Sequence, residues 1–585
     1  MERAGFENVV QLFRGRCVFV WLWQRNGLSH CGVLIRAMFF RVKPSRHYRY
    51  LQIARSVRVD GKVRQQIIAT LGRMDVLEAS GQLERLLRSG LKYCEKIKVL
   101  DAHAAGETRP VSISRIGPDL VFGRLWQEMG IGEVIEALCA GRRFGFAVER
   151  AIYLTVLHRL FVSGSDRAAE RWKESYRIPG AEKIDLHQLY RAMAFLGSPT
   201  GEEGALGSPR CVKDLIEEAL FDRRRDLFTE VGLVFFDTTS IYFEGQGGAS
   251  IGQHGHSKDH RPDLRQMIVG IALDSEGRPL CCEMWPGNTA DVKTFPQVVA
   301  RMRSRFRVQS LYVVADRGMV SAETLAAFEA MEPPVHYIVG VRMRRQKEVG
   351  GIVLKNKTPW VEITPERKFA KDPAPLKIKE VQVEDRRYVV CLNEEERRKD
   401  AHDREAIVAS LRDQLRRGDK TLVGNKGYRR FLKTGSGSGF DVDEEQVKND
   451  ALYDGVWVLR TDTDLDAETV AHAYKMLWTV EATFRTAKSI LETRPIYHKR
   501  DETIRGHVFC SYLALILKRE LEERMSEKEL TWEWAEVIRG LDELQEVEAE
   551  LHGQRYVLRS QILGDASQAL RGAGVAAPPP MRPGK

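Results

Sequence analysis

The sequence predicts a mixed α/β protein, and two apolar stretches that each end on an aspartate carry this prediction. The first covers residues 231–237 and ends on Asp237, and the second covers residues 310–316 and ends on Asp316. Each is short, apolar and free of proline, as is typical of a buried strand. An aspartate at the end of such a strand would be held at the rim of a sheet, where the active sites of α/β folds gather.

The segments between the two aspartates predict how their strands are connected. Residues 266–280 have the pattern of a β-hairpin whose polar turn ends at Gly277, and residues 294–306 have that of a connecting helix. This order could place both aspartates on adjacent strands. Two carboxylates held close together need a counter-cation, and hard oxygen ligands select Mg²⁺ or Mn²⁺. The alternative is that Asp237 only caps a turn through the threonines that follow it.

A third candidate carboxylate, Glu481, lies far downstream in a segment that predicts one helix over residues 473–488. On an ideal helix, one set of side chains in this segment falls within an arc of about 80°. The members of this face are Tyr474, Leu477, Glu481, Arg485 and Lys488. The alternative is an ordinary solvated face with a Glu481–Arg485 ion pair, which would not need Tyr474 and Leu477 on the same stripe.

Two strand-borne aspartates and a glutamate on a later helix resemble the DDE transposases of bacterial insertion sequences. Tyr474, Glu481 and Lys488 also resemble the Y-x2-R-x3-E-x6-K signature of the IS-four superfamily, although Leu477 stands where the signature has arginine. Four further stretches are similar to the elongated branch of that superfamily, and the resemblance covers about residues 41–517. These stretches are residues 255–264, 286–291, 494–498 and 504–507.

The resemblance implies a fold, a chemistry and a partner. The fold would be an RNase H-like catalytic core, interrupted by a β-rich insertion domain and preceded by a helical DNA-binding region. Asp237, Asp316 and Glu481 would be catalytic and would hold two Mg²⁺ ions, with Mn²⁺ as a substitute. Tyr474 and Lys488 would hold the DNA near the scissile bond. The protein would bind the terminal inverted repeats of its element and catalyse strand cleavage and strand transfer.

Further DNA contacts are expected from Arg485, a candidate replacement for the missing signature arginine, and from a loop rich in glycine and histidine over residues 245–264. The histidines and acids of this loop could form a transition-metal site. They are His254, His256, His260, Asp259 and Asp263. The basic residues in the same loop favour a DNA contact instead, with Lys258 and Arg261 on phosphates.

Composition agrees with a polyanionic partner. Lys and Arg number 91 against 81 for Asp and Glu, which gives a formal net charge of +10 and a pI near 9.0. We therefore expect double-stranded DNA, both inverted repeats and target, as the partner, and a homodimer because two ends must be held. Nine cysteines without CxxC spacing argue against a zinc ribbon and a disulfide framework. No apolar run approaches the roughly 18 residues of a membrane span. A cytoplasmic bacterial protein, nucleoid-associated when active, is expected.

A chain of 585 residues is too long for one core, so several domains are expected. The predicted organisation begins with an over-extended or disordered N-terminus (1–37), a basic β-hairpin and helix that bind DNA ends (38–117) and a helical DNA-binding region (118–230). The first part of the core (231–320) follows, and a β-rich insertion domain (321–469) separates it from the second part with the Glu481 helix (470–525). An acidic helical region with a disordered tail (526–585) ends the chain.

Within these domains, the hairpin over residues 48–71 could lie along a DNA groove or could be an edge ribbon kept soluble by arginine. Residues 152–160, with Arg167, Arg171 and Lys173, could supply a DNA-facing helix, or could belong to a plain helical bundle. In the insertion, we expect strands at 335–341, 350–354, 388–392 and 452–461 around a charged helix over 394–417. A base could stack on Tyr428, Trp360 or Trp457, although a buried core is the commoner place for tryptophan.

Two other functions fit the same residues. The first is a catalytically inactive, domesticated DNA-binding protein, which the change to Leu477 leaves open and the intact acidic residues oppose. The second is an RNase H-like structure-specific nuclease that cuts DNA without strand transfer. Joining of a 3′-end to target DNA separates a transposase from both.

Overall fold

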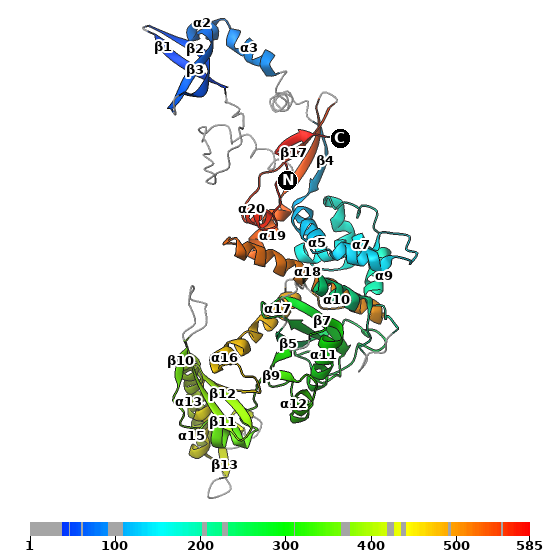
Figure 1. The fold of residues 1–585 in the computed structure, drawn as a ribbon, viewed down its shortest axis with the longest axis vertical. Coiled ribbons are helices and arrows are strands. Elements are labelled where there is room, and N and C mark those ends of the chain that lie inside the picture. Colours follow the sequence, from blue (N-terminus) through cyan, green and yellow to red (C-terminus); the bar gives the residue numbers. More distant parts are fainter. Residues whose placement is uncertain are drawn as a thin grey trace. The chain divides into compact units, whose positions relative to one another are not determined.

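The computed structural model describes two units, and the smaller one is built around a three-stranded antiparallel sheet (Figure 1). The described residues are 38–45, 47–59, 62–91, 109–201, 208–224, 232–308, 311–363, 375–417, 426–434, 440–489, 493–551 and 554–584. The units span Met1–Thr108 and Arg109–Lys585. The prediction for residues 1–37 lies outside the described residues.

In the smaller unit the expected hairpin is confirmed, and a further strand pairs with it. The strands are β1 (Met38–Ser45), β2 (Tyr48–Val59) and β3 (Lys62–Arg73). The helix expected after the hairpin divides into α2 (Met74–Ala79) and α3 (Gln82–Leu91), with Gly81 between them at a φ of +64°. Leu77 of α2 packs over Gly72, next to the buried Leu51 of β2.

The region of residues 118–230 is helical in its described part, as predicted. Its elements are η2 (Asp119–Gly123), α5 (Arg124–Glu128), α6 (Ile131–Cys139), α7 (Val148–Phe161), α8 (Asp166–Trp172), η3 (Lys173–Ser175), α9 (Leu186–Leu196) and α10 (Val212–Arg224). The suggestion that residues 152–160 face DNA is wrong, because α7 is buried along this whole segment and packs against α9 and α18 (Asp501–Glu527). Arg167 and Arg171, which were predicted together with this segment, are exposed on α8.

A nine-stranded mixed sheet forms the centre of the larger unit. Its order is β10-β11-β12-β15-β9-β8-β5-β6-β7. The strands of this sheet that come first along the chain are β5 (Leu233–Tyr242), β6 (Gln266–Leu273), β7 (Pro279–Pro286), β8 (Leu311–Ala315) and β9 (Val335–Gly340). β6 pairs antiparallel with both β5 and β7, whereas β8 pairs parallel with β5, and β9 pairs parallel with β8. Both faces of β5 are covered, because Phe235 and Phe236 belong to different core clusters.

The insertion differs from the predicted separate domain, because its strands extend the same sheet. They are β10 (Val361–Ile363), β11 (Leu376–Val383), β12 (Arg386–Leu392) and β15 (Val456–Thr461), and β15 pairs with β9. The expected strand at 350–354 is wrong. A helical turn, η5 (Val349–Val353), forms there because Val349 and Val353, four residues apart, both reach the buried core. The charged helix is confirmed as α13 (Glu394–Arg417).

The remaining elements of the larger unit are mostly helical. They are α11 (Asp291–Phe306), α12 (Ala322–Glu329), α14 (Lys426–Arg429), β13 (Leu432–Thr434), β14 (Phe440–Val442), α15 (Glu444–Asp450), η7 (Ala451–Tyr453), α16 (Ala467–Lys475), α17 (Leu477–Ser489), α19 (Trp534–Asp542) and α20 (Ala566–Gly572). No helix in the described part of the chain is long and apolar enough to cross a membrane.

The C-terminal region differs from the predicted acidic helices and disordered tail. A four-stranded sheet forms there, in the order β18-β17-β16-β4. Its strands are β4 (Arg109–Arg115), β16 (Gln545–Leu551), β17 (Gln554–Arg559) and β18 (Met581–Pro583). The buried Glu546 explains why the tail is held, since it pairs with Arg582 of β18 and with Arg177.

Candidate catalytic site

The two predicted aspartates lie side by side on neighbouring parallel strands. Phe236 of β5 is in register with Ala315, the last residue of β8, so Asp237 and Asp316 are the next residues along the two segments. The expectation that the first strand ends on Asp237 is wrong, because β5 continues to Tyr242, whereas Asp316 directly follows β8 as expected. Asp237 is 24% exposed, whereas Asp316 stands exposed at the end of its strand. The expected juxtaposition therefore follows from the parallel pairing of β5 with β8.

Asp237 is electrostatically the most unusual member of this pair. Burial raises the pKa of its carboxyl group to about 6, and the nearby Asp316 and Asp291 act in the same direction. Lys258 and the Thr238 backbone N–H, which donates to Asp237 Oδ1 at 2.7 Å, oppose this rise. The negative charge of Asp237 is thus only partly compensated by the protein itself.

Tyr474 of α16 contacts the second aspartate directly. Its hydroxyl donates to Asp316 Oδ1 at 3.0 Å, and burial together with the Asp316 charge raises the pKa of Tyr474 well above its usual value. The phenol therefore stays protonated and remains a donor. Gly340, the last residue of β9, makes room for it, because a Cβ there would lie 2.3 Å from the Tyr474 hydroxyl.

Replacing Gly340 by alanine should lower the free energy of unfolding by about 2 kcal/mol, because the added methyl group overlaps the Tyr474 hydroxyl. Chemical denaturation measures this loss. The same substitution in a Tyr474→Phe background should recover part of it, since the overlapping oxygen is gone. Gly351→Ala is the matched control, because a Cβ at Gly351 meets nothing within 4 Å. An equal loss in both backgrounds would contradict this contact.

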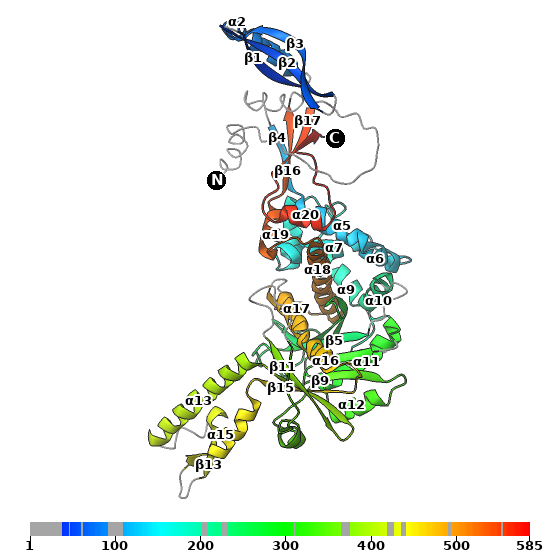
Figure 2. The same ribbon diagram turned by 60° about the vertical axis from the view of Figure 1, so that its left-hand side comes forward.

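The third predicted carboxylate sits on a helix separate from Tyr474. The expected single helix over 473–488 is wrong, since α16 ends at Lys475 and α17 begins at Leu477. The two helices cover different strands: α16 packs on β9 and β11, and α17 on β5 and β6 (Figure 2). Glu481 is exposed on α17. Among the residues described, the carboxylates of Asp237, Asp316 and Glu481 do not come close enough to form one three-ligand metal group.

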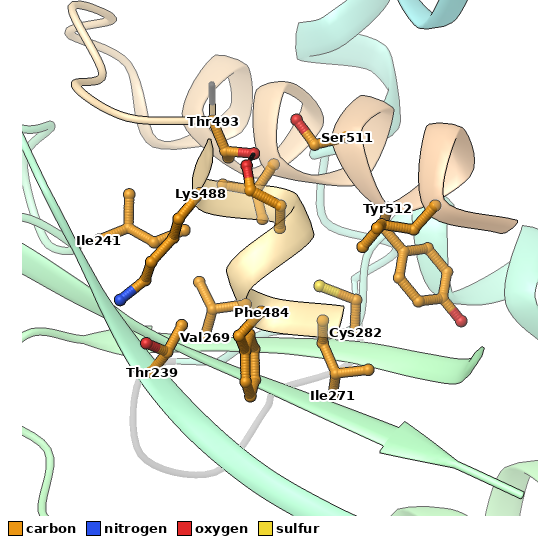
Figure 3. Close-up of a pocket in the computed structure, with 13 residues that line it drawn as sticks. Thr239, Ile241, Val269, Ile271, Cys282, Phe484, Lys488, Thr493, Ser511 and Tyr512 are labelled. Atoms are coloured by element: carbon orange, nitrogen blue, oxygen red, sulfur yellow. Dashed lines mark hydrogen bonds between the residues drawn. The ribbon is translucent and has the colours of Figure 1, made fainter. Parts of the chain in front are cut away.

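The covered side of α17 borders a small cavity of about 20 Å³ (Figure 3). Phe484 and Lys488 of α17 line it together with Ile241 of β5, Ile271 of β6 and Tyr512 of α18. The lining is almost entirely apolar, and the space is about that of one water molecule. The helix that carries Glu481 is therefore incompletely packed on its sheet-facing side.

The loop over residues 255–264 contacts both α17 and β5. Asp259 accepts contacts at 2.8 Å from Lys488 of α17 and from Arg494, and it is only 7% exposed. Lys258 turns inward: its Nζ donates to the Thr238 carbonyl at 2.7 Å and lies 3.2 Å from Asp291 Oδ2. This arrangement differs from the expected contact of Lys258 with a phosphate.

Two other expected DNA contacts are solvent-facing. Arg261 pairs with Asp263 at 2.9 Å and lies over the Tyr242 ring, with 5.6 Å between the guanidinium carbon and the ring centroid. Arg485 is exposed on α17, one turn beyond Glu481.

A cluster that the sequence did not predict lies in the helical region. Asp166, His498 and His507 are the one group of three potential metal ligands found in the described part of the chain, and the loop histidines 254, 256 and 260 form none there. His498 Nε2 lies 3.1 Å from His507 Nδ1 and 3.4 Å from Asp166 Oδ2. The stretches that contain both histidines had been singled out, but nothing in them pointed to Asp166.

The hydrogen bonds of His507 favour a structural network over a metal site. His507 Nε2 lies 3.2 Å from the Thr493 carbonyl and must carry the proton, which leaves Nδ1 as an acceptor. Arg159 occupies that acceptor at 2.9 Å. Burial, with Arg159 beside it, lowers the pKa of His507 well below its usual value. This imidazole is neutral, and the lone pair on its Nδ1, which a metal ion would need, already accepts a hydrogen bond from Arg159.

Comparison with known proteins places this site in a family. The model for the N-terminal domain of IS1634 family transposases matches residues 40–104, and the transposase DDE domain matches residues 232–517. A solved structure, the cryo-EM structure of the piggyBac transposase synaptic complex with hairpin DNA, is 12% identical, with a TM-score of 0.36, and the match covers 73% of this chain and 78% of that chain. No curated protein matches.

Together the two matched domains define a transposase, an enzyme that acts on DNA. The chain belongs to the DDE transposases of insertion sequences, and the matched DDE domain contains Asp237, Asp316 and Glu481.

Proposed function

We propose that this transposase binds the terminal inverted repeats of its insertion sequence and uses Asp237, Asp316 and Glu481 to cleave and transfer DNA strands. The observation that carries the proposal is the parallel pairing of β5 with β8, which holds two carboxylates side by side. The strand order β7-β6-β5-β8-β9 in this sheet, with α17 packed on β5 and β6, supports an RNase H-like core. Membership of the IS-four superfamily is part of this proposal and rests on Tyr474, Glu481 and Lys488, which keep the signature spacing, with Leu477 in place of its arginine.

The residues present fit a divalent metal centre. All three acidic side chains offer hard oxygen donors, and the raised pKa of Asp237 marks a carboxylate whose charge needs a further cation. We infer that Asp237, Asp316 and Glu481 hold two Mg²⁺ ions, for which Mn²⁺ can substitute, with the aspartate pair as the preformed part, because Glu481 does not join the two aspartates in one ligand group in the described part of this structure. When bound, such ions activate an attacking water or 3′-hydroxyl and neutralise charge on the phosphate. Tyr474 orients Asp316 through its hydrogen bond.

DNA would be held by basic side chains around this centre and by the N-terminal parts of the chain. Arg485, which is exposed, and Arg261, which is half-buried, can reach phosphates near the scissile bond, and Lys488 can do so by leaving Asp259. The three-stranded sheet of the smaller unit and Arg167 and Arg171 of α8 are candidates for binding the element's ends. We expect a homodimer in the complex, because two ends must be joined, in a cytoplasmic bacterial setting.

Incubation with labelled DNA that carries the element's own ends tests this function. Metal-dependent nicks at the element boundary, absent in EDTA, and joining of the 3′-ends to target DNA are expected. Cleavage without joining would favour a structure-specific nuclease. Tight binding without any cleavage would favour a domesticated DNA-binding protein.

The pH dependence of metal binding is a separate prediction. A metal ion needs the Asp237 carboxylate, whereas the proton competes for it below its raised pKa of about 6. Affinity for Mn²⁺ should therefore be fully developed at pH 7 and fall about tenfold by pH 5, as followed by calorimetric titration. In Asp237→Asn this part of the pH dependence should vanish. Equal affinity at both pH values would contradict the prediction.

A further inference from the structure

The salt bridge between Lys258 and Asp291 lies beside Asp237, and neither of its residues has a predicted catalytic role. Lys258 Nζ is 3.2 Å from Asp291 Oδ2 and 4.0 Å from Asp237 Oδ1. The three residues come from different segments: the loop over 255–264, the first turn of α11, and β5. All three side chains are between 24% and 30% exposed, so water screens their charges only in part.

Thr238 holds the ammonium group of Lys258 between the two carboxylates. Lys258 Nζ donates to the Thr238 carbonyl at 2.7 Å and to its hydroxyl at 2.8 Å. The same hydroxyl donates to Asp291 Oδ1 at 2.8 Å. Lys258 is thus held between two carboxylates and lies closer to Asp291 than to Asp237.

We propose that Asp291 sets the divalent-metal affinity of the catalytic site by neutralising Lys258. An unneutralised ammonium 4.0 Å from Asp237 would compete with a metal ion for that carboxylate and would repel the ion. The negative charge of Asp291 cancels this effect and draws Lys258 to its own side. Asp291 is therefore a positioning residue that holds Lys258 away from Asp237 and balances its charge, and this inference rests on the proposed metal site at Asp237.

Opposite effects of two single substitutions test the proposal. Asp291→Asn keeps the shape and the acceptor for Thr238 but removes the charge, and should weaken Mn²⁺ binding roughly fivefold. Lys258→Met keeps the aliphatic stem and should strengthen binding by about the same factor. The double variant should return to within about twofold of the unmodified protein. The measurements are paramagnetic resonance titration of Mn²⁺ and the Mn²⁺-induced rise in melting temperature, both without DNA.

Two further variants make the outcome decisive. Asp263→Asn changes net charge equally, on a carboxylate that pairs with Arg261 on the surface, and should leave Mn²⁺ affinity unchanged. Asp237→Asn reports whether the metal binds where proposed: unchanged binding in this variant would overturn the catalytic site itself. If Asp237→Asn abolishes binding but both Asp291→Asn and Lys258→Met weaken it, or if the double variant stays as weak as Asp291→Asn, the charge-balance role of Asp291 is overturned alone.

Discussion

Glu481→Gln should reduce DNA strand cleavage by about a thousandfold or more while leaving binding to the element's ends intact. Glutamine keeps the size of the side chain but supplies no negative charge to a metal ion, and metal-assisted stabilisation of a phosphoryl transition state contributes several kcal/mol. Because Glu481 is exposed on α17, its replacement removes no packing from the core. Single-turnover cleavage of labelled end DNA and a parallel gel-shift titration measure the two quantities.

The matched control for this experiment is Glu468→Gln on α16, an exposed glutamate in the neighbouring helix. It should cleave at the rate of the unmodified protein. Cleavage by Glu481→Gln at that same rate would remove Glu481 from the catalytic set and leave only the aspartate pair.

Arg159→Met should lower the free energy of unfolding of the larger unit by about 3–5 kcal/mol, the effect expected when one member of a buried charged network is removed. Arg159 is 3% exposed on α7 and donates to the His507 carbonyl at 2.8 Å as well as to Ser511 Oγ. Without it, His507 Nδ1 loses its donor, and the buried Asp166 loses a nearby positive charge. Urea denaturation followed by tryptophan fluorescence measures the change.

Arg167→Met is the control for this substitution, because Arg167 is exposed on the adjacent α8. Its effect should stay within about 0.5 kcal/mol. A similarly small effect of Arg159→Met would mean that the network around His507 does not hold α7 to α18.

The elements that the sequence predicts well are those whose pattern is complete within one segment. The strand β8 and the helices of residues 119–224 each carry their own apolar period and form within the segments predicted for them, and β5 forms as well but runs past Asp237 to Tyr242. The break at Met476 was not predictable in this way. One helical period runs through it, but α16 packs on β9 while α17 packs on β5, and only the assembled sheet imposes that division.

Contacts between residues far apart in the sequence account for the other differences between the prediction and the structure. The tail at 581–583 becomes a strand because β17 and the buried Glu546 hold it, and neither is visible in the proline-rich sequence itself. In the site, the aspartate pair was predictable from two strands. The inward turn of Lys258 was not, since it depends on Asp291 at the start of a distant helix.

The pairing of β15 with β9 joins the insertion to the catalytic sheet. Backbone hydrogen bonds run without interruption from β12 through β15 and β9 to β8, the strand that Asp316 follows. Asp316 is therefore tied to the insertion through the backbone of one sheet, whereas Glu481 stands on α17, a helix that meets the sheet through its side chains.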